Sequence, residues 1–190
     1  MALKATIYKA TLQLADMDRN LYGDHELTIA RHPSETDERM LIRLLAFALN
    51  VPANSDQGTL EFAKDMWNID EPALWRKNLM GDIEEWIEVG QPDEKRLLQC
   101  SSRSKRVIVY SFSSSTSQWW SSVGPKIVRA RNLTVWQIPA EQSQALAELA
   151  NRSMKIDVTV QEGTIWVGDG KKSFEVSLSR LCGSADTPHH

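Results

Sequence analysis

Four acidic side chains stand close together between Gly81 and Gly90, in the stretch Gly-Asp-Ile-Glu-Glu-Trp-Ile-Glu-Val-Gly. A β-strand sends alternate side chains to opposite faces. Asp82, Glu84 and Glu88 would then share one face of this strand, and mainly apolar side chains would cover the other. Neighbouring carboxylates repel one another, and each loses hydration when it is covered. A bound divalent cation would relieve that cost, so the spacing predicts a metal site on this strand.

Magnesium is the cation that such a site would favour, because Mg²⁺ prefers oxygen ligands and commonly binds one or two carboxylates, waters and a phosphate group. Mn²⁺ would serve as its substitute, since it accepts the same carboxylate ligands. We expect one ion between or beside Glu84 and Glu88, with Glu38 approaching from a preceding helix and Asp82 as a further ligand. A metal ion held there could polarise a phosphoryl oxygen and lower the pKa of its bound water.

Two basic residues follow the strand within about one helical turn. Lys95 or Arg96 could stabilise the negative charge that develops on phosphorus during phosphoryl transfer. The acidic strand and these cations together predict hydrolysis of a phosphodiester bond. Glu88 would be the central residue of this catalytic site, because it lies near the carboxyl end of the strand. Ligands tend to bind at the carboxyl ends of strands in α/β sheets.

The same residues also admit a purely structural interpretation. Asp82, Glu84 and Glu88 could form the hydrated face of an antiparallel strand. Lys95 and Arg96 could be ordinary surface charges, and the acidic residue of the helix could serve only to complement the helix dipole. The sequence pattern leaves both interpretations open.

The strongest helix signal covers residues 34–49. Ser34 can cap the helix, and Asp37, three residues later, forms a capping-box-like pair with it. Asn-Val-Pro at 50–52 ends the segment. Leucine and alanine recur every three or four residues and form the core stripe. Glu38 falls at the edge of that stripe, so we expect its side chain to be partly buried.

The remaining patterns predict an α/β protein. Strands are expected at 3–14, 27–30, 60–66, 106–112 and 133–138, helices near 92–100, 119–120 and 139–152, and a three-stranded antiparallel meander over 156–178. The order of the acidic strand, a helix and the apolar strand 106–112 predicts a βαβ crossover, and therefore a parallel pair of strands. We expect a single domain in which a mixed sheet is flanked by helices.

Size and charge limit the classes of function. The 190 residues suit one domain, over 1–182, and we expect a disordered tail at 183–190. A net charge of −3 gives no overall attraction to nucleic acid, although Arg103, Lys105 and Arg106 form a local basic cluster that could contact a phosphate backbone or simply be hydrated. No apolar run approaches a membrane span, and the two cysteines are too few for a disulfide scaffold. These features predict a cytoplasmic protein with no membrane partner; a protein partner is not identified.

Several stretches carry a resemblance to a known family. They are 1–10 (Met-Ala-Leu-Lys-Ala-Thr-Ile-Tyr-Lys-Ala), 30–36 (Ala-Arg-His-Pro-Ser-Glu-Thr), 38–40 (Glu-Arg-Met), 86–96 (Trp-Ile-Glu-Val-Gly-Gln-Pro-Asp-Glu-Lys-Arg) and the pair Trp-Trp at 119–120. They resemble the bacterial YaeQ proteins, and the likeness runs from the N-terminus to about residue 180. The resemblance implies a compact variant of the PD-(D/E)XK nuclease fold, with antiparallel strands added at both ends.

The resemblance also implies a set of site residues. In the PD-(D/E)XK superfamily, an acid on the first core helix, an acid on one strand and a Glu-X-Lys motif on the next strand surround Mg²⁺. By this likeness Glu38 corresponds to the helix acid, Glu84 to the first strand acid and Glu88 to the acid of Glu-X-Lys. The implied activity is a Mg²⁺-dependent nuclease that acts on DNA or RNA.

The motif departs from the superfamily at its lysine. Gly90 stands in that position. The lysine's role would pass to Gln91, Lys95 or Arg96, or would be lost. The missing lysine therefore affects the expectation of catalytic turnover more than the expectation of metal binding.

A second departure concerns the two strand acids. Glu84 and Glu88 lie on one strand, whereas the superfamily usually separates its two strand acids by a hairpin; Asp82 or Asp70 are the alternatives for the first acid. The alternative function is therefore a non-catalytic module that binds nucleic acid or a protein on a degenerate nuclease scaffold.

Overall fold

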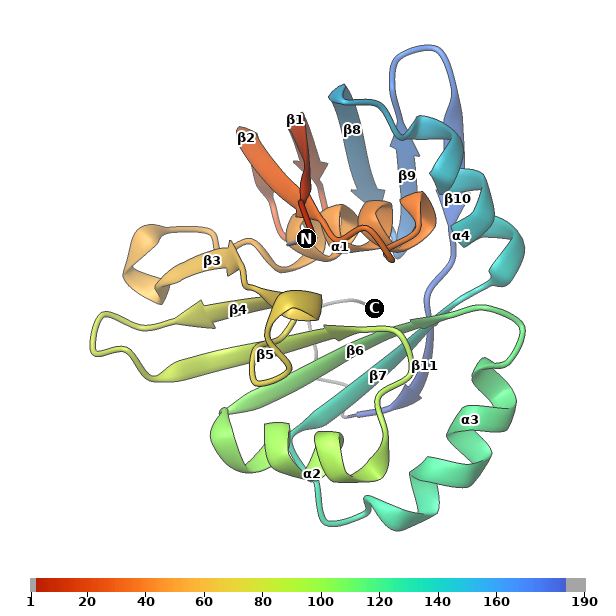
Figure 1. The fold of residues 1–190 in the computed structure, drawn as a ribbon. Helices are drawn as coiled ribbons and strands as arrows, with labels where there is room; N and C mark the ends of the chain where they lie inside the picture. Colours follow the sequence, from red (N-terminus) through yellow and green to blue (C-terminus); the bar gives the residue numbers. More distant parts are fainter. Residues whose placement is uncertain (1–2, 184–190) are drawn as a thin grey trace. The chain divides into compact units, whose positions relative to one another are not determined.

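The computed structural model describes residues 3–183, and the chain divides into two compact units. Unit 1 comprises residues 3–49 and 141–177, and unit 2 comprises residues 50–140 and 178–183. Each unit contains one β-sheet with its own helices (Figure 1). No helix within residues 3–183 is both long and apolar enough to cross a membrane.

Unit 1 is built on a five-stranded sheet in the order β10-β9-β8-β1-β2. Its elements are β1 (Thr6–Asp16), β2 (Leu21–Arg31), α1 (Asp37–Asn50), α4 (Ala140–Leu146), the 3₁₀ turn η4 (Ala147–Leu149), β8 (Ser153–Gln161), β9 (Thr164–Gly168) and β10 (Ser173–Val176). β1 and β8 are parallel, and the other neighbours are antiparallel. Apolar side chains alternate along β1 and β8, so that one face of the sheet is buried and the other faces solvent.

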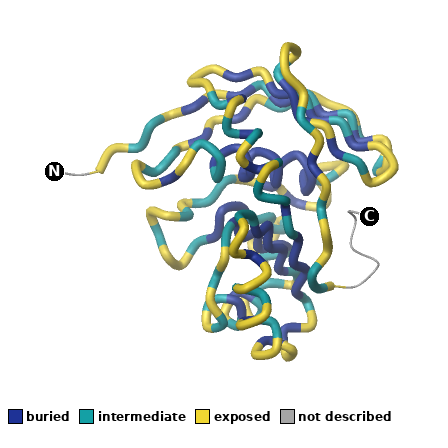
Figure 2. The backbone as a smooth tube through the Cα atoms, turned by 90° about the vertical axis from the view of Figure 1, so that its right-hand side faces the viewer, coloured by how far each residue is buried: buried dark blue, intermediate teal, exposed yellow. Residues whose placement is uncertain are grey.

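Helix α1 lies along the buried face of this sheet (Figure 1). Every residue from 40 to 50 is buried, and most of the helix is therefore dark blue in Figure 2. Contacts with the strands fix its position, since the guanidinium of Arg43 donates to the carbonyl of Ala30 on β2 (3.1 Å). The ring of Phe47 also meets the ring of His25 edge-on.

Unit 2 is built on a six-stranded sheet in the order β11-β7-β6-β5-β4-β3. Its elements are the 3₁₀ turn η1 (Ser55–Gln57), β3 (Thr59–Phe62), the 3₁₀ turn η2 (Asp65–Trp67), β4 (Leu74–Lys77), β5 (Ile83–Val89), α2 (Glu94–Arg103), β6 (Arg106–Phe112), α3 (Thr116–Val123), the 3₁₀ turn η3 (Gly124–Lys126), β7 (Leu133–Ile138) and β11 (Ser179–Cys182). β5, β6 and β7 are parallel, and β3, β4 and β11 are antiparallel to their neighbours. Helices α2 and α3 cover the same face of the parallel strands, where Trp86, Leu97 and Val123 share one apolar cluster.

Most predicted elements are confirmed. The strands expected at 106–112 and 133–138 are β6 and β7, and the acidic segment followed by a helix and β6 is a parallel βαβ crossover. The C-terminal meander is β8, β9 and β10. The predicted strand at 60–66 is shorter, because it gives way to η2. Residues 184–190, which include most of the predicted tail, lie outside the described part of the chain.

The prediction of a single mixed sheet is wrong, because the strands form two sheets. β8 pairs with β1 of unit 1 and not with the strands of unit 2. Alternation along a strand shows which side chains are buried, but it does not identify the neighbouring strand. β11 was not predicted, and a register shift between Arg180 and Cys182 interrupts its pairing with β7.

The N-terminal cap of α1 also differs from the prediction. Thr36, and not Ser34, caps the helix, since its Oγ1 accepts a hydrogen bond from the backbone N–H of Arg39 (3.1 Å). The backbone N–H of Ser34 instead donates to Nδ1 of His32 (3.0 Å). Residues 32–35 form a turn before the helix, and this turn directs the Glu35 carboxylate towards Arg43.

Protonation of His25 is expected to make the stability of the protein depend on pH. Burial lowers the pKa of His25, and Asp24 opposes this shift only partly. The unfolded chain therefore binds a proton before the folded protein does, and the free energy of unfolding falls as the pH drops through about 6.5 towards the lower pKa of the folded state. Urea unfolding at pH 7.5 and 5.5 would measure this loss. It should be smaller in His25→Gln, and an equal loss in both proteins would contradict the prediction.

Candidate functional site: the acidic strand β5

β5 lies inside the sheet of unit 2, antiparallel to β4 and parallel to β6. The alternation predicted for it is present over residues 85–89, with Trp86 and Glu88 on the face that α2 covers and with Ile87 buried on the opposite face. A register shift against β4 interrupts it before Glu85, and Ile83, which was predicted to share the face of Ile87, packs against the same apolar cluster as Trp86. The acidic face is therefore not a hydrated surface along its whole length. Glu88 lies beneath a helix, whereas Asp82 and Glu84 lie near the open end of the strand.

Glu88, which is buried, forms an ion pair with the half-buried Arg96 of α2. Its Oε1 atom lies 2.7 Å from one terminal nitrogen of the guanidinium and 2.9 Å from Nε. The same oxygen accepts a hydrogen bond from the indole N–H of Trp86 (2.7 Å). Burial alone would lower the pKa of Arg96, but Glu88 outweighs that effect and raises it. The guanidinium of Arg96 therefore keeps its positive charge beside Glu88.

Arg96 also stabilises the loop at 68–73, which precedes β4, through hydrogen bonds. Its guanidinium donates to the carbonyl oxygens of Ile69 and of Glu71, the latter at 2.9 Å. The local sequence accounts for its position, because the carboxylate of Asp93 caps α2 by accepting from the backbone N–H of Arg96 (2.8 Å). Glu88 and Arg96, which were predicted to bind a metal ion and to stabilise charge on phosphorus, therefore connect β5, α2 and this loop.

Glu88 also influences the buried thiol of Cys100. Burial raises the pKa of Cys100 to about 12, and the nearby Glu88 carboxylate adds to this shift. The thiol therefore stays protonated at neutral pH. A protonated thiol is neither a nucleophile nor a metal ligand, so Cys100 adds no reactive group to the site.

Asp82 and Glu84 stabilise the turn between β4 and β5. The side-chain amide of Asn78 donates to both carboxylates, at 3.1 Å to Asp82 and at 2.9 Å to Glu84. The Lys105 ammonium lies 2.6 Å from Glu84 and lowers the pKa of that carboxyl group. Both acids therefore already have partners within unit 2.

Glu38 belongs to unit 1, on the first turn of α1. It is half-buried, as predicted, and its Oε1 accepts a hydrogen bond from the hydroxyl of Ser143 on α4 (2.6 Å). Ser143 is itself fully buried. Glu38 therefore also serves to join two helices of its unit.

Metal binding by these carboxylates stays a prediction. Within residues 3–183, no three His, Cys, Asp or Glu side chains are grouped closely enough to hold a metal ion. Glu84 and Glu88 are four residues apart on an extended strand, which separates their Cα atoms by about 13 Å. The ion that we expected between or beside these two carboxylates therefore stays a prediction, and Oε1 of each carboxylate already has a cationic partner in Lys105 or Arg96.

The other predicted residues around β5 are spread over its end and its neighbours. The side-chain amide of Gln91 donates to the hydroxyls of Ser113 (3.2 Å) and Ser115 (2.9 Å) beyond β6. Lys95 is exposed on α2. The structure does not bring Gln91 to the Glu88–Arg96 pair, and Asp70 lies exposed in the loop before β4.

The predicted basic cluster is largely engaged with β5 and its neighbours. The Arg103 guanidinium lies over the ring of Trp86, 5.4 Å from its centre. Lys105 pairs with Glu84, and Arg106 lies 3.2 Å from the buried carboxylate of Glu85. These acids reduce the positive potential that a phosphate backbone would meet.

Two residues with structural roles here were missed at the sequence level. Glu85 is buried on the opposite face of β5, between Arg106 and Arg76 (3.3 Å). Strand alternation places Glu85 among apolar side chains, but it does not reveal the two arginines that pair with it. Asn78 organises the β4–β5 turn, and the sequence Asn-Leu-Met-Gly-Asp at 78–82 carries the only signal for it, since asparagine and glycine favour turns.

Comparison with known proteins gives matches over nearly the whole chain. The family model described as "YaeQ protein" matches residues 1–178. "Uncharacterized protein YaeQ" of Escherichia coli (strain K12) is 42% identical over 180 residues, which cover 94% of this chain and 97% of that protein. The protein of the same name from Salmonella typhi is 40% identical over the same shares.

Two solved structures share the fold. The crystal structure of YaeQ protein from Xanthomonas axonopodis pv. citri has a TM-score of 0.87 and 39% sequence identity, and the match covers 95% of this chain and 100% of that one. The crystal structure of YaeQ protein from Pseudomonas syringae also has a TM-score of 0.87, with 41% identity and coverage of 95% and 97%. The mixed α/β architecture with two mixed sheets is consistent with these structures.

Proposed function

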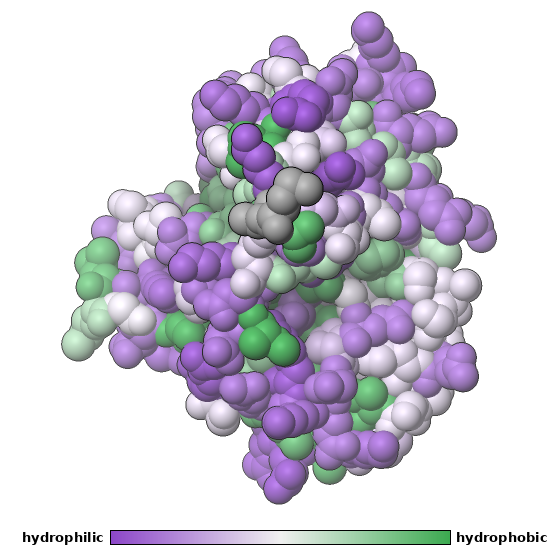
Figure 3. Space-filling model, viewed as in Figure 1, coloured by the Kyte–Doolittle hydropathy of each residue, from purple (hydrophilic) through white to green (hydrophobic). Residues whose placement is uncertain are grey.

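The chain belongs to the YaeQ family, and from that premise we propose that it is a non-catalytic module that binds a protein partner through the β4–β5 turn of unit 2. One observation carries the proposal. Leu79 and Met80, side by side in this turn, are each 88% exposed. Apolar surface is visible in green at the end of the β4–β5 hairpin in Figure 3. Large apolar side chains presented together at a protein surface are typical of binding sites for other proteins.

The turn is held in one conformation by Asn78. The side-chain oxygen of Asn78 accepts hydrogen bonds from the backbone N–H groups of Met80 and Asp82, both at 2.9 Å. Its amide group donates to Asp82 and Glu84, and Gly81 adopts a φ of +89°, which favours glycine. A partner would therefore meet an ordered turn, which reduces the loss of conformational entropy on binding.

A second group of exposed apolar side chains lies in the loop after β3. Met66, Trp67 and Ile69 expose 40%, 40% and 81% of their surface. Arg96 fastens this loop through the carbonyls of Ile69 and Glu71 and is itself held by Glu88. The acidic strand therefore stabilises both of these exposed apolar segments.

The charges of unit 2 favour a protein over nucleic acid as the partner. Lys105 and Arg106, which were predicted to contact phosphate, are paired with Glu84 and Glu85. Asp82 adds a further exposed carboxylate next to the apolar turn. Negative groups at this position would repel a phosphate backbone.

A Mg²⁺-dependent nuclease is the second candidate, and one observation favours it. In Glu38, Glu84 and Glu88, all hydrogen bonds within the described chain go to Oε1, which leaves Oε2 of each carboxylate available to a cation. The predicted helix and strand that carry these residues are also present, as α1 and β5. The nuclease-like core and its activity on DNA or RNA remain a proposal.

Site-specific photo-crosslinking in bacterial cells would test the protein-binding proposal. Leu79 would be replaced by p-benzoylphenylalanine, and Val128, which is 77% exposed in the same unit, would be replaced in a matched control. We expect a discrete crosslinked protein from position 79 and none from position 128. The purified partner should bind Leu79→Ser/Met80→Ser about tenfold or more weakly than the wild type, since a central apolar contact is worth more than about 1 kcal/mol. The same crosslinks from both positions would count against the proposal.

A cleavage assay separates the two candidates. Purified protein would be incubated with single- and double-stranded DNA and RNA in the presence of Mg²⁺ or Mn²⁺. The binding-module proposal predicts no cleavage above the level of Glu88→Gln. Metal-dependent cleavage by the wild type that is lost in Glu88→Gln would instead support the nuclease proposal. The protein could then no longer be described as a non-catalytic module.

A further inference from the structure

The solvent-facing side of the unit 1 sheet contains an exposed tryptophan beside a cavity of about 210 Å³. Trp166, on β9, is 44% exposed, although the same face of the neighbouring strands carries mostly small or polar side chains. Its cross-strand neighbours are Thr159 on β8 and Glu175 on β10. An exposed indole on an inner strand, next to the edge strand β10, offers a flat apolar surface on which a ring can stack.

A glycine in the sheet allows the turn at 169–172 to approach closely beside this ring. Gly168 lies between Asp157 on β8 and Ser173 on β10. A Cβ atom at Gly168 would lie only 2.5 Å from the carbonyl oxygen of Lys172, so no other residue fits there without movement of the backbone. Gly168 is therefore required for the close approach of the turn that carries Lys171 and Lys172, and these residues line the cavity together with Asp157 and Ser173.

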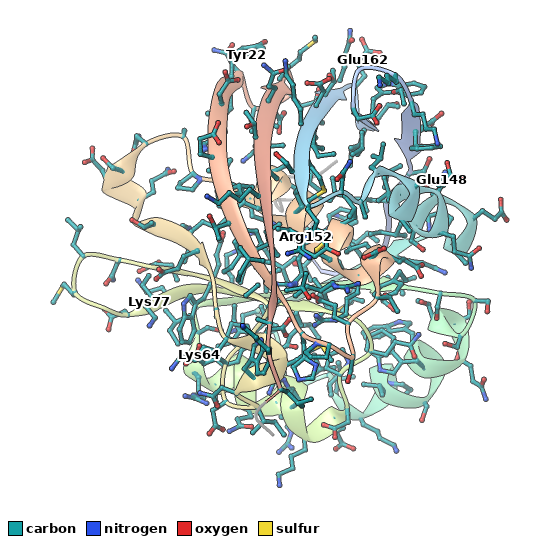
Figure 4. All side chains as sticks on the ribbon, turned by 45° about the horizontal axis from the view of Figure 1, so that its top comes forward. Tyr22, Lys64, Lys77, Glu148, Arg152 and Glu162 are labelled. Atoms are coloured by element: carbon teal, nitrogen blue, oxygen red, sulfur yellow. The ribbon has the colours of Figure 1, made fainter. Side chains whose placement is uncertain are left out.

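Two lysines stand at the rim of the cavity. Oδ1 of Asp169 accepts hydrogen bonds from the backbone N–H groups of Lys171 (2.9 Å) and Lys172 (2.8 Å), which fixes the turn that carries them. The side chain of Lys172 lies 3.8 Å from Glu148 of η4, which is labelled in Figure 4, and both groups are more than half exposed. Such exposed pairs contribute little, so a bound anion could compete with Glu148.

The polar groups that line the cavity have few partners inside the protein. Within residues 3–183, neither the carboxylate of Asp157 nor the indole N–H of Trp166 makes a hydrogen bond or an ion pair. The hydroxyls of Thr159 and Ser173 lie on the same wall. The cavity thus combines an apolar ring, hydrogen-bonding groups and two cations, all available to a ligand.

We propose that this cavity binds a phosphorylated sugar. Trp166 would stack on the apolar face of the sugar ring, while Asp157, Thr159 and Ser173 would form hydrogen bonds with its hydroxyl groups. Lys171 and Lys172 would bind the phosphate. The volume supports a ligand with a single ring, because pockets for larger drug-sized molecules begin at about 300 Å³. The shared chemistry is the sugar phosphate, which a free sugar phosphate or a nucleotide could supply.

Titration of the ¹⁵N-labelled full-length protein followed by NMR would test this proposal. The seven tryptophans give up to seven indole N–H signals, and the signal lost in Trp166→Ala identifies Trp166. The ligands would be glucose 6-phosphate, ribose 5-phosphate, AMP, glucose and inorganic phosphate. We expect saturable shifts of the Trp166 signal with at least one of the sugar phosphates or AMP, and weaker binding of glucose and of phosphate alone. Comparing the three phosphorylated ligands distinguishes a free sugar phosphate from a nucleotide.

Matched variants make the test specific to this cavity. Trp166→Ala should weaken binding about tenfold or more, as expected for the loss of a stacking contact. Its affinity would be read from the backbone signals of residues 168–173. Tyr22→Ala removes another exposed aromatic ring of the same sheet, on the edge strand β2 (Figure 4), and should leave the affinity unchanged. Lys171→Gln/Lys172→Gln should lower the affinity for the phosphorylated ligands but not for glucose. Absence of saturable shifts with every phosphorylated sugar, or equal effects of Trp166→Ala and Tyr22→Ala, would overturn the proposal.

Discussion

Replacement of Glu35 by alanine is expected to lower the free energy of unfolding by about 3–5 kcal/mol, because it leaves a buried cation without its counter-charge. The side chains of Glu35 and Arg43 expose only 1% and 3% of their surface. Two hydrogen bonds join them, at 2.5 and 2.9 Å, and Arg39 donates to the same carboxylate. The loss should appear as a lower urea midpoint in circular dichroism.

Two further variants show whether burial causes this effect. Glu148→Ala removes an exposed ion pair of the same unit and should cost less than about 1 kcal/mol. The double variant Glu35→Leu/Arg43→Met removes both buried charges and should recover much of the stability that Glu35→Ala loses, since apolar side chains can often replace a buried pair. Equal free energies of unfolding for Glu35→Ala and Glu148→Ala would contradict the prediction, because the buried Glu35–Arg43 pair would then contribute no more than an exposed pair.

The Glu35–Arg43 pair also shows where prediction from sequence ends. A helical wheel places Arg43 opposite the leucine stripe of α1. The wheel does not reveal that the opposite side is buried as well, because this depends on the turn at 32–35 and on the Ala30 carbonyl. Thr36 was likewise overlooked as the cap in favour of Ser34, two positions earlier, because either residue type can cap a helix.

The acidic strand leads to a similar conclusion. Its extent and the crossover to β6 follow from local pattern and are confirmed. Its alternation holds only over residues 85–89, because the register shift against β4 could not be read from the strand itself. The partners of its acids do not follow from that pattern. Arg96 reaches Glu88 only because Asp93 sets the start of α2, and Lys105 meets Glu84 only because β6 returns parallel to β5. A row of carboxylates therefore predicts a need for positive charge, but the sequence does not show whether a metal ion or an arginine provides it.

Glu88→Gln is the second substitution with a large expected effect, and it addresses that question directly. It removes the charge that balances the half-buried Arg96, so we expect a loss of about 2–4 kcal/mol in the free energy of unfolding. Since Arg96 also holds the carbonyls of Ile69 and Glu71, limited proteolysis should cut the loop between β3 and β4 faster than in the wild type. Glu84→Gln is the matched control, because its partner Lys105 is 63% exposed, and it should cost less than about 1 kcal/mol.

The response to Mg²⁺ then distinguishes an ion pair from a metal site. A cation that binds only the folded protein raises the free energy of unfolding by RT ln(1 + [Mg²⁺]/Kd). If Arg96 alone neutralises Glu88, millimolar Mg²⁺ should leave the urea midpoints of the wild type and of Glu88→Gln unchanged. The opposite result would be a wild-type urea midpoint that rises with Mg²⁺ and a Glu88→Gln midpoint that does not. It would mean that Oε2 of Glu88 binds a cation while Oε1 stays paired with Arg96. Charge neutralised inside the protein favours a binding module, whereas a carboxylate that still attracts a cation would restore the nuclease as the better proposal.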